Sequence, residues 1–218
     1  MAIPRIVVLI SGRGSNLAAL LRSERDGNLG GTVCAVISSR DGAPGLAIAA
    51  AQGVATMAVD HRRFATRDAF DAALNSAIAA SAPDLVVLAG FMRILGADLV
   101  RRYEGRMLNI HPSLLPAYPG LHTHRRALAD GVRVHGCTVH FVTADLDHGP
   151  IVAQAAVPVE PGDDEATLAA RVLAAEHLLL SQTVRAFCEK RLVIEARQER
   201  VNHSAPSFDA GAAGAADL

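Results

Sequence analysis

The sequence is poor in aromatic residues and carries almost no excess charge. Its 218 residues include no tryptophan, two tyrosines and six phenylalanines. Lysine and arginine number 21 against 22 aspartates and glutamates, so the formal net charge is -1. Binding to nucleic acid relies on a summed positive field and, for single strands, on aromatic stacking. We therefore expect no nucleic-acid partner.

Cysteines and long apolar runs are also scarce. The three cysteines, Cys34, Cys137 and Cys188, lack CxxC spacing and lie in or beside apolar segments, as packing residues do in a reducing compartment. No apolar stretch reaches the roughly 20 residues that cross a bilayer. The first residues lack the pattern of a secretory signal. The sequence predicts a cytoplasmic protein with no membrane partner.

Short β-branched runs alternate with longer segments rich in alanine and leucine over the first half of the chain. This alternation is typical of βαβ units around a parallel sheet. We expect buried central strands at residues 5–10, 32–37, 54–59, 84–89 and 106–110, because each run is short and continuously apolar. Helices are expected near residues 16–23, 45–51, 66–80 and 97–102.

The pattern changes after residue 111, where prolines at 112, 116 and 119 predict a rigid loop. Runs at 137–143 and 151–158 then predict an antiparallel pair, followed by a long helix over 164–190. The predicted fold class is α/β: a single-domain, Rossmann-like, mostly parallel twisted sheet with an antiparallel C-terminal strand pair and helices on both faces. We expect one domain over residues 1–195 and a disordered, Ala/Gly-rich tail over 202–218.

The first candidate site is the loop Ser11-Gly12-Arg13-Gly14-Ser15-Asn16, between the first strand and the first helix. Free backbone N–H groups and the helix dipole attract an anion at such a place. A dinucleotide fingerprint is excluded because its third glycine would fall at Leu17, and no Walker lysine is present. The loop therefore predicts a phosphate cradle; the alternative is a tight turn in which Ser15 caps the helix.

The second candidate site is the segment Asn109-Ile110-His111-Pro112, at the carboxyl end of a predicted buried strand. Alternation along a strand puts Asn109 and His111 on the same face. An amide can donate to a developing oxyanion, and a protonated imidazole can supply charge or a proton. The pair suits acyl transfer, although a strand-end histidine that only bonds to backbone is an equal alternative.

Other histidines and one aspartate lie around this segment. Asp147, in the turn between the last two strands, could face His111, where a carboxylate favours the protonated imidazole; the alternative is an ordinary turn residue. His122 and His124 have the spacing of a metal pair but lack further ligands, so we expect no metal. His140 could line the cleft or lie in the core, and the sequence does not decide between them.

Four motifs occur in a characteristic order: SGRGSN at 11–16, AGFMRIL at 89–95, NIHPSLLPAYPG at 109–120 and DLDHGP at 145–150. Over about residues 5–195 the sequence resembles the phosphoribosylglycinamide formyltransferases. The resemblance implies transfer of formyl from the co-substrate 10-formyltetrahydrofolate to the amine of glycinamide ribonucleotide, in purine biosynthesis. It also implies a catalytic set of Asn109, His111 and Asp147.

The resemblance further implies two groups of binding residues. The nucleotide would contact Gly14, Ser15, Asn16 and Glu176. The folate would contact Arg67, Met92, Arg93, Ile94, Leu95, Asn109, Thr143, Ala144, Asp145, Leu146 and Asp147. The partners are thus small molecules, and we expect a monomer or a weak homodimer. The helical spacing of Val172, Glu176 and Leu179 independently places a carboxylate on an apolar face, where it needs a partner.

Two positions depart from the family pattern of small or neutral residues, Arg13 and His148. Arg13 could chelate phosphate oxygens or face solvent, and His148 could face water. No cysteine, nor Ser113, has a recognisable activating base, so we expect direct attack of the amine without a covalent intermediate. Three rival functions are a formyltetrahydrofolate hydrolase, a methionyl-tRNA formyltransferase and a non-catalytic phosphometabolite-binding module. The hydrolase would carry an extra module before the first strand and the tRNA enzyme a basic C-terminal domain, and the sequence shows neither.

Overall fold

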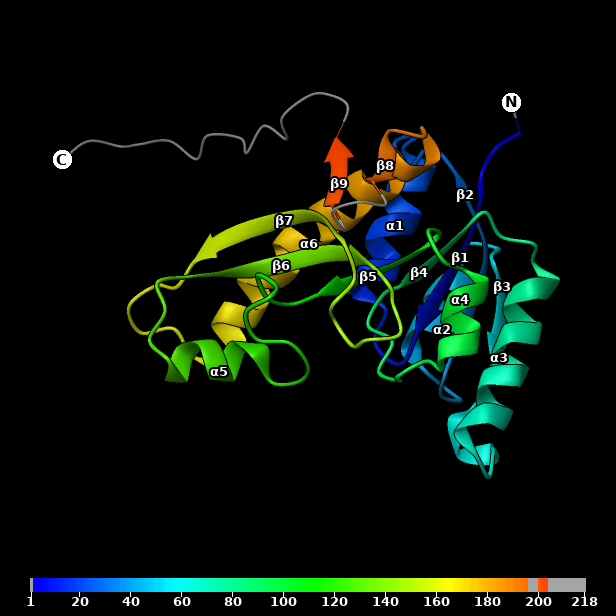
Figure 1. The fold of residues 1–218 in the computed structure, drawn as a ribbon, viewed down its shortest axis with the longest axis horizontal. Coiled ribbons are helices and arrows are strands. Elements are labelled where there is room, and N and C mark those ends of the chain that lie inside the picture. Colours follow the sequence, from blue (N-terminus) through cyan, green and yellow to red (C-terminus); the bar gives the residue numbers. More distant parts are fainter. Residues whose placement is uncertain (1, 196–199, 204–218) are drawn as a thin grey trace.

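Seven strands form one sheet in the order β3-β2-β1-β4-β5-β6-β7 (Figure 1), in a computed structural model that describes residues 2–195 and 200–203. The strands are β1 (Arg5–Ile10), β2 (Thr32–Ser38), β3 (Ala55–Ala58), β4 (Leu85–Leu88), β5 (Met107–His111), β6 (Val134–Phe141) and β7 (Ile151–Pro158). The helices are α1 (Ser15–Arg25), α2 (Pro44–Ala50), α3 (Arg67–Ala80), α4 (Ala97–Arg102), α5 (Thr123–Ala129) and α6 (Glu165–Cys188), with a 3-10 turn, η1, at His61–Arg63. A separate hairpin pairs β8 (Leu192–Glu195) with β9 (Arg200–His203).

The sheet has the predicted mixed character. Strands β1 to β5 pair in parallel, whereas β6 is antiparallel to both β5 and β7. The strand order reverses between β1 and β4, and open α/β sheets bind ligands at the carboxyl ends of strands at such a point. The loops after these two strands are joined, because Ser11 N donates to Gly90 O at 3.1 Å and Met92 N donates to Ser11 Oγ at 2.8 Å.

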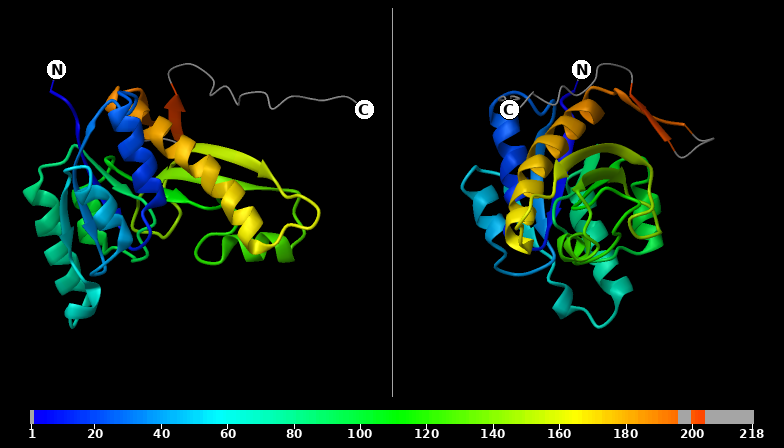
Figure 2. Two further views of the ribbon diagram at one scale, coloured as in Figure 1. Left: turned by 180° about the vertical axis from the view of Figure 1, so that it is seen from behind. Right: turned by 90° about the vertical axis from the view of Figure 1, so that its left-hand side faces the viewer.

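Helices cover both faces of the sheet, as predicted. Side chains of one face, such as Ile6 and Val8, pack with α1, α2 and α6. The alternate side chains, such as Val7 and Leu9, pack with α3 and α4. Figure 2 shows α1 and α6 side by side over one face. Burial on both faces explains why β1 and β4 are continuously apolar.

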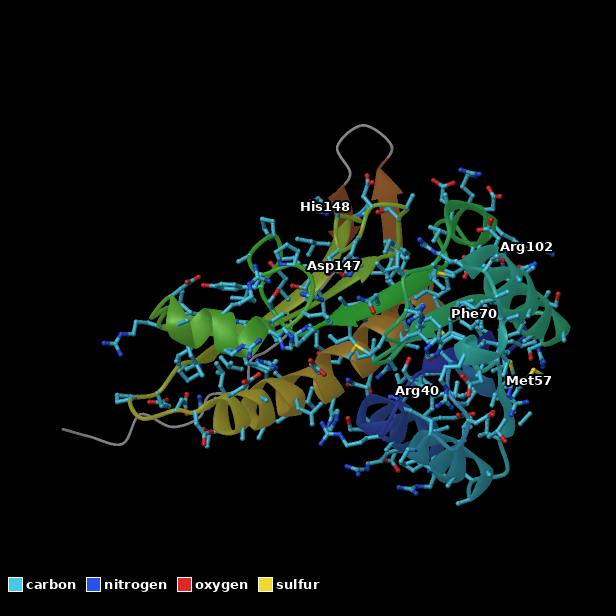
Figure 3. The ribbon with its side chains drawn as sticks, turned by 90° about the horizontal axis from the view of Figure 1, so that it is seen from below. Arg40, Met57, Phe70, Arg102, Asp147 and His148 are labelled. Carbon is cyan, nitrogen blue, oxygen red and sulfur yellow. The ribbon has the colours of Figure 1, made fainter. Side chains whose placement is uncertain are left out.

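One expectation about the strands was wrong, and the structure adds two details at the helices. Strand β3 is an exposed edge strand, not a buried central one, and Met57 is 48% exposed at the outer edge of the sheet (Figure 3). Helix α5 follows the predicted proline-rich loop, in a segment for which no element was expected. Ser15 does not cap α1; Gly14 is its N-cap, with φ 77° and no side-chain capping bond.

Most of the predicted Ala/Gly-rich tail lies outside the described residues. Asn202 and His203 belong to β9, and residues 204–218 lie outside the described residues. Among the helices of the described ranges, none is both apolar enough and long enough to span a bilayer.

Candidate active site

Gly14 of the 11–16 loop is required by close packing against the start of α2. Gly14 has φ 77°, and a Cβ there would lie 2.7 Å from the Cα of Gly45. Gly45 N also donates to Gly12 O at 3.1 Å, which fixes the loop against the start of α2. The loop leads directly into α1, whose first N–H groups have no partner within the helix. This is the local geometry of an anion cradle.

A buried polar pair lies beneath this loop. Asn16 Nδ2 donates to Glu176 Oε2 at 2.7 Å, across 160 residues of sequence, and each residue is only 7% exposed. Burial raises the pKa of Glu176, while the bond from Asn16 opposes that rise. Asn16 Oδ1 is buried without a hydrogen-bond partner. The carboxylate expected on the apolar face of α6 therefore has its partner in α1, and the pair retains an unused acceptor.

Asn109 and His140 face each other across two antiparallel strands. They are direct partners in the β5–β6 register, and Asn109 Nδ2 lies 3.0 Å from His140 Nε2. His140 Nδ1 lies 2.9 Å from Phe141 O, an acceptor, so Nδ1 carries the proton and Nε2 accepts from the amide. Burial lowers the pKa of His140, against the opposing effects of the Phe141 carbonyl and the Asp147 carboxylate. His140 is thus a neutral ring that is both buried and part of the cluster.

The Asp147 carboxylate lies between two imidazoles. Its Oδ2 is 3.5 Å from His111 Nδ1, and its Oδ1 is 3.8 Å from His140 Nε2. Gly120 N donates to Oδ2 at 2.8 Å. Asp147 has φ 56°, a left-handed backbone conformation that turns its side chain into the cluster. The structure therefore brings Asn109, His111 and Asp147 into one cluster, with His140 between Asn109 and Asp147.

The proline-rich loop folds back over His111. His111 is buried and its Nε2 lies 3.0 Å from the carbonyl oxygen of Tyr118. The Ser113 hydroxyl donates to Ala117 O at 2.6 Å, which tightens this loop. Both ring nitrogens of His111 thus face oxygen acceptors, one from Tyr118 and one from Asp147.

The segment after β4 is tied to α3. Arg67 Nη2 donates to Leu95 O at 2.5 Å, and Gly96 N donates to Asp71 Oδ2 at 2.7 Å. Burial raises the pKa of Asp71, while Gly96 and Arg67 act in the opposite direction. Met92 and Ile94 are exposed on this segment, and the side chain of Arg93 is exposed between them. Arg67 and residues 92–95 therefore form one continuous wall.

A second wall of the site is the turn between β6 and β7. Figure 3 labels Asp147 and His148 in this turn. Thr143 Oγ1 donates to Asp145 O at 3.1 Å within it. The turn faces the proline-rich loop across an open depression of about 640 Å³. The depression is lined by Pro119, Gly120, Ala144, Asp145, Leu146 and His148.

His122 and His124, which have the spacing of a metal pair, lie at the start of α5. His122 precedes α5 in a left-handed conformation, and the ring of His124 contacts that of His135 at 5.3 Å between centroids. Within residues 2–195 and 200–203, no three potential metal ligands among His, Cys, Asp and Glu come together.

Three groups of the cluster had no signal strong enough to identify them from the sequence. The Gly120 N–H and the Tyr118 carbonyl are backbone groups, and their positions depend on how the proline-rich loop folds. The sequence does not decide whether His140 lines the cleft or lies in the core. Its place follows from the strand register, which pairs it with Asn109.

The fold and site can be compared with known proteins. The formyl transferase family model matches residues 4–184. The chain belongs to the formyl transferase family. It is 51% identical over 187 residues to the phosphoribosylglycinamide formyltransferase of Escherichia coli K12, which covers 86% of this chain and 88% of that protein. Identity to the Mycobacterium tuberculosis H37Rv protein of the same name is 47% over 193 residues, covering 88% and 89%.

A solved structure of the same family agrees in fold. Glycinamide ribonucleotide transformylase 1 from Symbiobacterium toebii superposes with a TM-score of 0.89 at 50% identity, covering 92% of this chain and 94% of that chain. The formyl transferase family thus accounts for the whole seven-stranded sheet and both groups of helices.

Proposed function

We propose that this formyl transferase moves the formyl group of 10-formyltetrahydrofolate to the amine of glycinamide ribonucleotide, a step of purine biosynthesis. The mechanism rests on the position of the Asp147 carboxylate. Its Oδ2 lies 3.5 Å from His111 Nδ1, and its Oδ1 lies 3.8 Å from His140 Nε2. His111 lies at the carboxyl end of β5, and the 11–16 loop follows the carboxyl end of the parallel strand β1. The names of the similar proteins support the choice of acceptor.

In the proposed mechanism the amine attacks the formyl carbon directly. The carbonyl oxygen gains negative charge, and Asn109 and the imidazolium of His111 stabilise it. Asp147 holds the imidazolium charged and oriented, and His140 holds the Asn109 amide by accepting one of its N–H bonds. The amine then loses its proton to solvent or to the same cluster. When the tetrahedral intermediate collapses, the bond from the formyl carbon to the folate nitrogen breaks, and that nitrogen takes up a proton from solvent or the same cluster as tetrahydrofolate leaves. Holding two substrates together contributes much of the rate.

We assign the two substrates to different parts of the site. Gly14, Ser15 and Asn16 bind the phosphate, and the carboxylate of Glu176 bonds to the ribose. The folate lies between the two walls described above: Arg67 with Met92, Arg93, Ile94 and Leu95 on one side, and Asn109 with Thr143, Ala144, Asp145, Leu146 and Asp147 on the other.

The test is a tetrahydrofolate-release assay with purified protein, with and without glycinamide ribonucleotide. We expect release only with the acceptor, together with formylated nucleotide. Release without acceptor would instead indicate a hydrolase, and binding without release a non-catalytic module. His111→Ala and Asp147→Asn should each lower kcat by about a hundredfold or more while nucleotide binding persists. Near-normal turnover in either variant contradicts the proposed roles.

A further inference from the structure

Arg13 occupies the middle of the 11–16 loop, between Gly12 and the left-handed Gly14. Its side chain is exposed, and within residues 2–195 and 200–203 its guanidinium has no hydrogen bond or ion pair. Of the other arginines near this edge, Arg62 binds Asp60, Arg63 binds Asp41 and Arg67 binds Leu95 O, whereas Arg40 and Arg93 are exposed. Arg13 therefore keeps all its donors available next to the cradle.

The charge of a phosphate group makes this free cation significant. A phosphate monoester carries about 1.5 to 2 negative charges at neutral pH. The start of α1 supplies the equivalent of about half a positive charge. The remaining side chains of the cradle, Ser15, Asn16 and Glu176, add no positive charge, and the only lysine in the sequence, Lys190, follows the far end of α6. Helix and backbone alone leave most of the phosphate charge uncompensated.

A second observation indicates that this place receives a polar ligand. Asn16, in the first turn of α1, is 7% exposed, and its Oδ1 is buried with no hydrogen-bond partner. An unpaired buried acceptor is costly and is satisfied when a ligand brings a donor such as a sugar hydroxyl. A sugar phosphate carries both a hydroxyl donor for Asn16 and an anion for the loop.

We propose that Arg13 binds the phosphoryl group of the acceptor and makes the enzyme select phosphorylated over dephosphorylated acceptors. The guanidinium reaches from the loop and chelates two phosphoryl oxygens while the α1 N–H groups bind the others. This inference rests on the proposed function, since it concerns the same acceptor. It adds a residue that determines specificity and is distinct from the catalytic cluster around Asp147.

Arg40 is the competing cation. It is exposed at the carboxyl end of β2, labelled in Figure 3, and the loop is joined to this strand end by Ser11 Oγ and Ser39 Oγ at 2.7 Å. Its backbone N–H is held by the Ser38 hydroxyl at 3.1 Å. Arg40 follows the neighbouring strand β2, whereas Arg13 belongs to the 11–16 loop itself. We therefore assign phosphate binding to Arg13. Arg40→Ala is then the comparison that decides between them.

The experiment measures kcat and KM for glycinamide ribonucleotide and for its dephosphorylated nucleoside in the full chain. Arg13→Ala should raise KM for the nucleotide about tenfold or more with little change in kcat, and should leave kcat/KM for the nucleoside unchanged. Arg13→Lys, which keeps the charge but not the planar guanidinium, should have a KM for the nucleotide between those of wild type and Arg13→Ala. Arg125→Ala, an exposed arginine of α5, is the charge-matched control and should behave as wild type.

Three results would overturn the assignment: an unchanged KM in Arg13→Ala, an equal loss for the nucleoside, or a loss confined to Arg40→Ala. Binding of ribose 5-phosphate, measured by calorimetry, does not depend on turnover and should weaken by a similar factor in Arg13→Ala. If the wild-type chain transfers no formyl group, the proposed function fails, while weaker ribose 5-phosphate binding by Arg13→Ala still supports the role of Arg13.

Discussion

At the scale of single residues, the amide of Asn109 depends on His140 for its orientation. The neutral His140 ring accepts one Asn109 N–H at 3.0 Å, which leaves the second N–H for the oxyanion. We predict that His140→Ala lowers kcat about tenfold to a hundredfold with little change in KM, because small misplacements of catalytic groups are costly. Steady-state kinetics on variants with unchanged thermal unfolding provide the check.

The matched variant for this prediction is His140→Gln. A glutamine carbonyl can still accept from the Asn109 amide, so kcat should recover in part relative to alanine. If alanine and glutamine behave alike and close to wild type, the orienting role of His140 is wrong.

Some residue-level features follow from the sequence and others do not. Strand alternation places Asn109 and His111 on one face, and helical spacing places Glu176 among buried leucines. The hydrogen bond from Gly120 N to Asp147 depends on the path of the proline-rich loop, which no periodicity encodes. A periodic sequence pattern predicts which face of a strand or helix a side chain occupies. Contacts made by loop backbone depend on the path of the folded loop, which no periodic pattern predicts.

At the scale of elements, α5 is attached to the sheet through histidines that are kept neutral. Burial, with the neighbouring ring of His124, lowers the pKa of His135 to about 4. The unfolded value is near 6.5, so the unfolded chain binds more protons between these pH values and stability falls as pH decreases through this window. We predict that His135 alone removes on the order of 2 kcal/mol of unfolding free energy between pH 7 and pH 5.

Urea unfolding at the two pH values measures this effect. His135→Phe keeps a ring next to Tyr118 but cannot titrate, so its stability should depend less steeply on pH. An identical pH dependence in wild type and His135→Phe would show that other groups cause it, and His124, whose pKa burial also lowers, would be the next variant to test.

Helix α6 has a capping box at its N-terminus. Thr167 N donates to Asp164 Oδ1 at 2.8 Å, and Asp164 N donates to Thr167 Oγ1 at 2.9 Å. Asp164→Ala should lower the unfolding free energy by about 1 kcal/mol, since it removes the acceptor for the first turn. Glu165→Ala, also in the first turn, removes only a charge near the dipole and should cost less. Equal losses in the two variants would show that the cap adds nothing beyond charge.

Elements buried in the core are the ones that the sequence predicts well. Strand β1 and the face of α6 with Leu168 and Val172 have long apolar patterns and lie where expected. Helix α5 buries few residues, Thr123 and Ala127, so its short apolar signal is hidden among prolines and glycines. Strand β3 has the composition of a strand, but its place at the edge follows from strand order, which local pattern does not specify.

At the scale of the whole molecule, the candidate site is assembled from segments far apart in the sequence. The 11–16 loop is joined to the segment after β4 through Ser11 and Met92 and to α6 through Asn16 and Glu176, and the turn after β6 meets the end of β5 where Asp147 approaches His111. All of these groups lie between Ser11 and Glu176, and the family model ends at residue 184. The hairpin of β8 and β9 lies beyond the end of the family match.

We therefore predict that a chain of residues 1–195 keeps the formyl transfer activity. It retains α6 complete but leaves β8 without β9, which contacts β7, so Tm should fall by a few degrees while kcat/KM stays close to that of the full chain. A chain of residues 1–183 is the control: it removes Val184 and Ala186, both fully buried, and should not fold stably, because that apolar surface of α6 covers the sheet. Tm and steady-state kinetics on the three chains distinguish the cases. If residues 1–195 fold as judged by Tm but have lost formyl transfer, then residues 196–218 contribute to the reaction, and the single-domain boundary at residue 195 is wrong.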